Sequence, residues 1–175
     1  MLPKGGIFIT SLRFFLLIGN SNFEHIKLII MSTPRYSAIM LVDDNELDNF
    51  INKKLIETEA FSAEVAVHAS AMSALDDLKK RAAQPASLPR IIFLDIMMPG
   101  MDGFGFLDEF AKLSDEVRKQ CKVVMLSTTE SFKDLNRANQ NPYVYKFLNK
   151  PLNKAVLDAI NIWLLVSFIL KKTAH

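Results

Sequence analysis

Four apolar runs and one alternating run, each ending in polar residues, recur between residues 36 and 150 of the chain. A continuous apolar run of this length is typical of a strand buried on both faces of a parallel sheet. Strict alternation around Val65 and Val67 indicates a shorter, half-buried strand. The expected strands are Ala38–Val42, Ala63–Ala69, Ile91–Asp95, Lys122–Leu126 and Tyr143–Leu148.

Apolar residues at helical spacing separate these strands. The first expected helix, Glu46–Thr58, is amphipathic, with an apolar face formed by Leu47, Phe50, Ile51 and Leu55. The other expected helices run from Ser70 or Ser73 to Arg81, from Gly105 to Leu113, from Phe132 to Asn139, and from an Asn153 cap to about Leu170. Alternating strands and helices predict an α/β fold with a doubly wound, five-stranded parallel sheet and right-handed crossovers.

Composition narrows the function classes. The 175 residues are 50% hydrophobic, which suits one folded domain and argues against disorder. A net charge of +2 with scattered lysines predicts no nucleic-acid surface. Cys121 is the one cysteine, so the chain forms no internal disulfide and no cysteine metal cluster. The three histidines show no spacing typical of metal ligands.

The two ends differ from the middle. Residues 1–35 hold short apolar bursts broken by charged residues, and none reaches the roughly 20 apolar residues of a membrane span. We expect an N-terminal extension, poorly ordered or upstream of the true start, for which Met31 is a natural start residue. Residues 162–175 are expected to form an apolar C-terminal helical extension. Core packing, a homodimer face and a frame-shifted end remain its alternatives.

Polar groups follow four of the five expected strands, and the chain delivers them in order: Asp43-Asp44, Asp95, Ser127-Thr128 and Lys150. Parallel strands place their carboxyl ends at one edge, where ligands bind in open α/β sheets. Three carboxylates at one edge repel one another, and a hard divalent cation such as Mg²⁺ removes that conflict. A cation, a lysine and a hydroxyl together suit a phosphoryl group, and a carboxylate can be its nucleophile.

Each signal alone has a plainer interpretation. Asp43 or Asp44 is equally consistent with a helix N-cap. Asp102-Gly103 is an ordinary turn signal, Ser127 a common cap, and Lys150 a solvated lysine before a helix. The combination, with one group at the end of each strand, favours a functional site.

These residues resemble a response-regulator receiver domain of two-component signalling. The resemblance rests on the acidic pair Asp43-Asp44, on LDIMMPGMDG around Asp95, on Ser127 after VVML, and on Lys150 in NKP. It covers residues 37 to about 161, taken as the domain 36–161, and implies a flavodoxin-like sheet of order 2-1-3-4-5 with helices on both faces. As a set the motifs are specific, although each alone is weak.

The resemblance implies a role for each matching residue. Asp95 accepts a phosphoryl group from a phosphohistidine. Mg²⁺ is bound by Asp44 and Asp95 through their side chains, by Met97 through its backbone carbonyl, and by Asp43 mainly through water.

Four further residues carry implied roles. Lys150 pairs with the phosphoryl oxygens, while Ser127 bonds the phosphoryl group and moves inward on activation. Thr128 supplies the small residue that follows, and Phe147 is the switch aromatic. Met97 and Thr129 occupy the positions that tune self-dephosphorylation.

The resemblance therefore predicts a cytoplasmic single-domain response regulator, which catalyses only its own phosphorylation and dephosphorylation. Its expected partners are a histidine kinase or histidine phosphotransfer protein and a downstream protein, with no nucleic acid and no membrane. One alternative is a Mg²⁺-dependent phosphohydrolase with an aspartyl nucleophile, which Met97 disfavours because those enzymes carry a second acid there. Another is an interaction module tethered to a membrane by its N-terminal residues.

Overall fold

The computed structural model of the chain describes residues 34–128 and 131–160. They belong to the second of two compact units, Pro34–His175, whereas the first, Met1–Thr33, lies outside the described residues. Residues 1–33 of the expected N-terminal extension, most of the expected last helix and the C-terminal extension also fall outside them, so these three stay predictions. Among the described residues, no helix is both long and apolar enough to cross a membrane.

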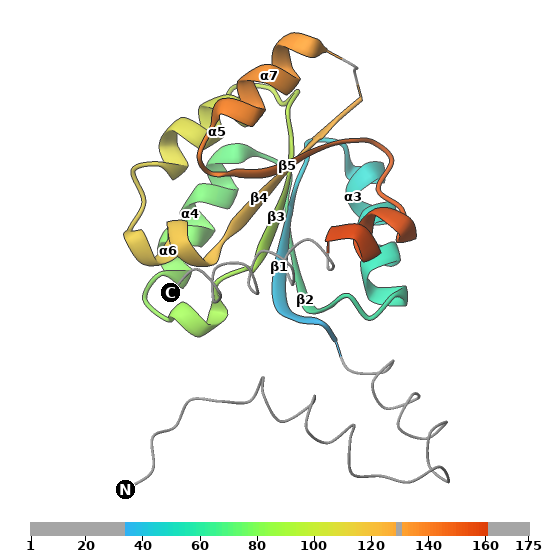
Figure 1. Ribbon diagram of the computed structural model, residues 1–175. Helices are drawn as coiled ribbons and strands as arrows, with labels where there is room; N and C mark the ends of the chain where they lie inside the picture. The colour runs from blue at the N-terminus through green and yellow to red at the C-terminus, as the bar shows by residue number, and fades with distance from the viewer. Residues whose placement is uncertain (1–33, 129–130, 161–175) are drawn as a thin grey trace, which may run out of the picture. The chain divides into compact units, whose positions relative to one another are not determined.

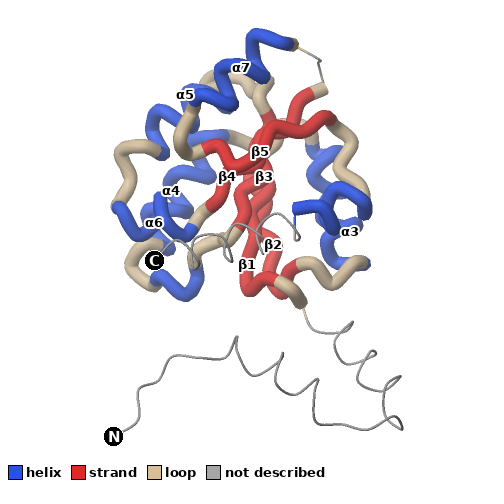
Figure 2. Tube along the Cα trace, viewed as in Figure 1, coloured by secondary structure: helices blue, strands red, loops and turns tan. Residues whose placement is uncertain are grey.

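A five-stranded parallel sheet of order β2-β1-β3-β4-β5 forms the centre of this unit, which confirms the predicted fold (Figure 2). Its strands are β1 (Tyr36–Val42), β2 (Ser62–His68), β3 (Ile91–Asp95), β4 (Lys122–Ser127) and β5 (Val144–Asn149). Each lies within two residues of the expected bounds. Because all five run in one direction, their carboxyl ends share one edge.

Helices cover both faces of the sheet (Figure 1). On one face lie α3 (Glu46–Thr58) and the helical residues 154–160. On the other lie α4 (Ala71–Arg81), α5 (Gly103–Phe110), α6 (Asp115–Gln120) and α7 (Phe132–Gln140). A short 3-10 turn, η1 (Pro85–Ser87), precedes β3.

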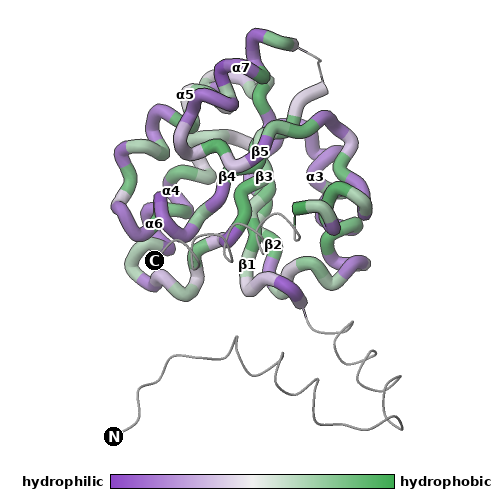
Figure 3. The backbone as a smooth tube through the Cα atoms, in the orientation of Figure 1, coloured by the Kyte–Doolittle hydropathy of each residue, from purple (hydrophilic) through white to green (hydrophobic). Residues whose placement is uncertain are grey.

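The core has two layers because successive residues of a strand point to opposite faces. Met40 and Val42 of β1 pack with the helices α4, α5 and α6, whereas Ile39 and Leu41 pack with Ile56 of α3. β1 is therefore buried on both faces: Ala38 to Val42 are each at most 2% exposed. Figure 3 shows the resulting concentration of hydrophobic residues along the strands, with hydrophilic residues on the outer helices.

The predicted apolar face of α3 is wrong in its first three residues. Leu47 is 63% exposed, Phe50 60% and Ile51 48%. The helix instead buries a stripe formed by Asn49, Asn52 and Ile56. These three also recur at helical spacing. The buried Asn49 side chain donates to the Asp43 carbonyl at the site-bearing edge of the sheet.

Two smaller differences from the predicted helices concern the start of α5 and the presence of α6. α5 begins two residues earlier than expected, because the Asp102 carboxylate caps it by accepting from the Gly105 N–H at 2.6 Å. The short helix α6 was not predicted, since its six residues contain one apolar side chain, Val117. The Asn153 cap is confirmed: its side chain accepts from the Val156 N–H at 3.0 Å.

Candidate functional site

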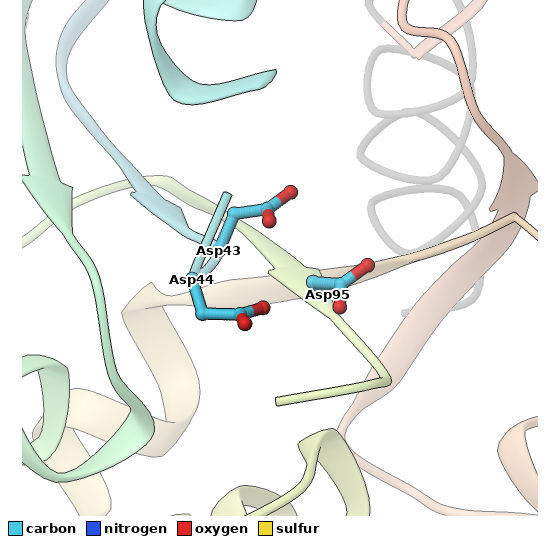
Figure 4. Close-up of side chains that lie close together, drawn as sticks. All are labelled: Asp43, Asp44 and Asp95. Atoms are coloured by element: carbon cyan, nitrogen blue, oxygen red, sulfur yellow. The ribbon is translucent and has the colours of Figure 1, made fainter. Parts of the chain in front are cut away.

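Three carboxylates gather where β1 and β3 end side by side (Figure 4). Asp43 and Asp44 directly follow β1, and Asp95 is the last residue of β3. One carboxylate oxygen from each lies within 4.8 Å of the others. Asp43 and Asp95 are buried, at 4% and 5% exposure, whereas Asp44 is exposed.

The turn after β1 fixes the first two acids. Asn45, not Asp43 or Asp44, is the N-cap of α3, and its side chain accepts from the Leu47 and Asp48 N–H groups. Asp43 Oδ1 accepts from the Asn45 N–H at 3.0 Å, while the Asn49 side chain donates to the Asp43 carbonyl at 2.6 Å. With Asn45 capping the helix, the carboxylate of Asp44 and the second oxygen of Asp43 remain available to the site.

Lys150 brings the fifth strand into the site. Its side chain is only 11% exposed, and its ammonium lies 2.6 Å from Asp43, 2.8 Å from Asp95 and 3.0 Å from Asp48. An ammonium has three N–H donors, so each carboxylate takes one of them. The plainer interpretation of Lys150 as a solvated lysine is therefore wrong.

Asp95 is held at both carboxylate oxygens. Oδ1 accepts from Lys150, and Oδ2 accepts from the Met97 N–H at 2.8 Å. Burial raises the pKa of Asp95 above its ordinary value, and the neighbouring Asp43 carboxylate adds to the rise, against the lowering effect of Lys150 and the Met97 N–H. Because three carboxylates share Lys150, its charge only partly offsets the cost of burying Asp95.

For the pKa of Lys150, burial is outweighed by hydrogen bonds, whereas for that of Asp95 burial dominates. Burial alone would lower the pKa of Lys150, but hydrogen bonds to Asp43, Asp95 and Asp48 outweigh burial and raise the pKa above its ordinary value. The lysine is therefore charged throughout the neutral range. A permanent cation at this edge suits an anionic ligand.

The remaining expected site residues lie around this edge. Ser127 ends β4 and is 2% exposed, and its carbonyl accepts from the Lys150 backbone N–H at 2.7 Å. Thr128 is exposed, the Met97 side chain is 70% exposed, and Phe147 of β5 is half-buried against the core. Thr129 lies outside the described residues.

The donor set fits a hard divalent cation. Carboxylate oxygens are the ligands that Mg²⁺ takes in proteins, and the acidic oxygens of Asp43, Asp44 and Asp95 converge. The exposed position of Asp44 leaves one side open to water, which Mg²⁺ retains in most protein sites. No nitrogen or sulfur ligand belongs to this group, so zinc is disfavoured.

Two contacts at the site were not predicted from the sequence. Asp48 contacts Lys150, and Asn49 supports the backbone of Asp43. Both lie in the first turns of α3, where an acid is ordinarily explained by the helix dipole. The available signal was their position, four to six residues after the acidic pair, which places them beside the same strand end.

The fold and this arrangement of acids, hydroxyl and lysine define an α/β receiver architecture with an acidic pocket at the carboxyl edge. The sequence pattern of the response regulator receiver domain matches residues 39–161, so the chain belongs to that family. The predicted family and fold are confirmed.

Proteins of similar sequence and similar structure support this family assignment. The chain is 34% identical over 115 residues to the probable methanogenesis regulatory protein FilR2 of Methanothrix harundinacea, a match that covers 66% of this chain and 72% of that protein. A two-component response regulator from Cytophaga hutchinsonii superposes with a TM-score of 0.68 at 27% identity, covering 73% and 96% of the two chains. The Mn²⁺-bound response regulator Rcp1 superposes with a TM-score of 0.56 at 25% identity, covering 71% and 88%.

Proposed function

We propose that the chain is a phosphoacceptor in two-component signalling and that Asp95 takes the phosphoryl group. The observation that carries the proposal is the buried Asp95 carboxylate, held between Lys150 and the Met97 N–H beside two further acids. An Asp95 oxygen attacks phosphorus and forms an acyl phosphate, while the phosphorus–nitrogen bond of a phosphohistidine breaks. The imidazole leaves with that electron pair and the phosphohistidine is returned as histidine.

The residues around Asp95 have separate roles in this proposed phosphoryl transfer. Lys150 is positioned to neutralise phosphoryl oxygens, and the Met97 N–H orients the attacking carboxylate. Asp43, Asp44 and Asp95 would hold Mg²⁺, which supplies positive charge to the phosphoryl oxygens when bound. The Mn²⁺-bound form of Rcp1 supports a divalent cation in this kind of domain.

The switch is proposed at β4 and β5. The buried Ser127 would turn its hydroxyl toward a phosphoryl group on Asp95, and the half-buried Phe147 would repack inward. The Lys150 N–H bond to the Ser127 carbonyl links the ends of these strands. The face formed by α7 and β5 then changes its population of conformers and its affinity for a downstream protein.

The exposed apolar residues of α3 support a protein as phosphoryl donor. Leu47, Phe50 and Ile51 lie on the helix that begins directly after the acidic pair, so a docked histidine kinase or phosphotransfer protein would lie near Asp95. A stand-alone regulator and a cytoplasmic location stay predictions. The membrane-tethered alternative rests on residues outside the described part, and fractionation with and without residues 1–30 tests it.

The decisive experiment is intact-mass measurement after incubation with acetyl phosphate, with and without Mg²⁺. We expect wild-type protein to gain one phosphoryl group only with Mg²⁺, and Asp95→Asn to gain none. Asp108→Asn is the matched control, because it removes an exposed acid from α5. We expect this variant to react as wild type does.

Two outcomes would contradict the proposal. The first is phosphorylation that survives in Asp95→Asn, which would move the acceptor to another residue. The second is a folded wild-type protein that gains no phosphoryl group from acetyl phosphate or from a panel of phosphorylated histidine donors, while a control receiver does.

A further inference from the structure

Lys150 is shared with a carboxylate that lies outside the cluster of three acids. Asp48 Oδ2 is 3.0 Å from the Lys150 ammonium, against 2.6 Å for Asp43 and 2.8 Å for Asp95. Asp48 does not belong to the group whose oxygens converge on one point. Its contact therefore acts on the lysine and not on the cation site.

Asp48 approaches Lys150 from the solvent side. The side chain of Asp48 is 33% exposed, whereas those of Asp43 and Asp95 are 5% and 7% exposed. Asp48, Thr128 and Lys150 line a shallow pocket of about 320 Å³ together with Ile51, Asn52, Pro151 and Leu152. The pocket leaves open space beside Lys150 on the side of α3.

The position of Asp48 is fixed by the helix that carries it. Its backbone N–H donates to Asn45 Oδ1 at 3.2 Å, within the cap of α3. The other two partners of Lys150 lie at strand ends: Asp43 directly follows β1, and Asp95 is the last residue of β3. Asp48 therefore attracts the Lys150 ammonium toward α3, whereas Asp95 attracts it toward the end of β3.

A phosphoryl group on Asp95 changes what Lys150 must contact. The ammonium has three N–H donors, and three carboxylates already use them. One existing bond has to be given up for a bond to a phosphoryl oxygen. The bond to Asp48 is the longest and the most exposed, so it is the one that yields most readily.

We infer that Asp48 is a positioning residue that restrains Lys150 and slows phosphorylation of Asp95. It competes with the incoming phosphoryl group for one N–H of the ammonium, and its charge also partly neutralises the lysine. This inference rests on the proposed function. It assigns to α3 a direct influence on the rate at which the site is loaded.

The test is the rate constant of phosphorylation by acetyl phosphate at saturating Mg²⁺, followed by intact mass. We expect Asp48→Asn to react roughly two- to fivefold faster than wild type, because a partly exposed ion pair contributes no more than about fivefold to a rate. Asp48→Ala is the second variant, should Asn at this position impair folding. Circular dichroism and thermal unfolding verify that each variant folds.

Glu46→Gln is the matched control. Glu46 is an exposed acid in the same first turn of α3, and it is not one of the three partners of Lys150. Its replacement removes the same charge without touching the lysine. We expect a rate within twofold of wild type.

Two measurements separate a specific role from a general one. In a Lys150→Met background, Asp48→Asn should no longer change the rate, because the competing contact is already gone. In ¹⁵N spectra, the ammonium signal of Lys150 should be visible in wild type and in Glu46→Gln, and should broaden in Asp48→Asn through faster exchange with water.

Equal rates for wild type and Asp48→Asn would overturn the inference, as would an acceleration that persists without Lys150. A slower Asp48→Asn would also overturn it, since Asp48 would then assist the lysine. If wild type is not phosphorylated at all, the proposed function fails, and the inference fails with it. The two failures are distinguished by the wild-type reaction.

Discussion

Gly103 packs directly against the carbonyl of Asp95. A Cβ atom at Gly103 would stand 2.6 Å from that oxygen and 3.0 Å from the Cα of Ile96. The Gly103 N–H also donates to the Ile96 carbonyl at 2.9 Å. The first residue of α5 therefore packs against the backbone of Asp95, the proposed phosphoacceptor, and only glycine fits there.

Replacing Gly103 by alanine should disrupt this packing against the backbone of Asp95 and Ile96. We expect Gly103→Ala to lower the free energy of unfolding by about 1–3 kcal/mol, because the atoms it meets are backbone atoms that cannot rotate away. Chemical denaturation measures the loss. Gly105→Ala is the control: its Cβ would meet the Met101 and Asp102 side chains, and alanine favours a helix. Equal stability of Gly103→Ala and wild type would contradict the packing described.

The exposed face of α3 predicts a contrast between two substitutions in one helix. We expect Phe50→Ala to change the free energy of unfolding by less than about 0.5 kcal/mol, since Phe50 is 60% exposed. Ile56→Ala should cost about 2–5 kcal/mol, since Ile56 is fully buried and leaves a cavity. Urea denaturation of both variants tests the orientation of the helix. A large loss in Phe50→Ala would restore the orientation predicted from the sequence.

Asp95 should make the domain less stable at neutral pH. A carboxyl whose folded-state pKa is raised by burial favours folding below its ordinary pKa, and this contribution is lost as pH rises through the folded value. At pH 7 without Mg²⁺, Asp95→Asn should therefore be more stable than wild type, by about 0.5–2 kcal/mol. The difference should shrink as pH falls toward 4.

Thermal unfolding in the presence of a chelator measures this difference. Asp108→Asn again serves as the control, because that acid is exposed. A less stable Asp95→Asn at pH 7 would mean that the ion pair with Lys150 outweighs the cost of burying the carboxylate.

Cys121 should report on unfolding. The thiol is 2% exposed, and burial raises the pKa of Cys121 to about 12. The raised value favours folding up to the ordinary thiol pKa, and the contribution is lost as pH rises toward 12. At pH 8 a disulfide reagent should therefore react only through opening of the structure.

The readout is unambiguous because the chain has one cysteine. Labelling in denaturant should yield one modified thiol per chain at once. Rapid complete labelling in native buffer would show that Cys121 is accessible in the folded state.

The fold followed from the sequence because its three central strands, β1, β3 and β4, are buried on both faces. Runs such as Ala38–Val42 and Ile91–Leu94 contain no polar residue, as expected of a strand covered on both faces. The site followed for the same reason: once the strands are parallel, their polar endings must meet at one edge. Asp43, Asp95 and Lys150 converge as expected.

The orientation of α3 could not be predicted in this way. Leu47, Phe50 and Ile51 form one helical stripe, and Asn49, Asn52 and Ile56 form another. Hydropathy favours the first stripe as the buried one. The second is buried because Asn49 supplies a hydrogen bond to the Asp43 carbonyl, which is a tertiary contact. Asp48 was missed for the same reason, since its partner is remote in sequence.

Lys150 lies 107 residues after Asp43, yet their side chains bond at 2.6 Å. During synthesis, a nascent chain that has emerged only as far as the end of β3 carries all three acids without the lysine. Its acidic edge is incomplete, and the repulsion among the carboxylates is unrelieved. The complete pocket of three acids and one lysine is assembled only when β5 has joined the sheet, so the site and the five-stranded sheet form together.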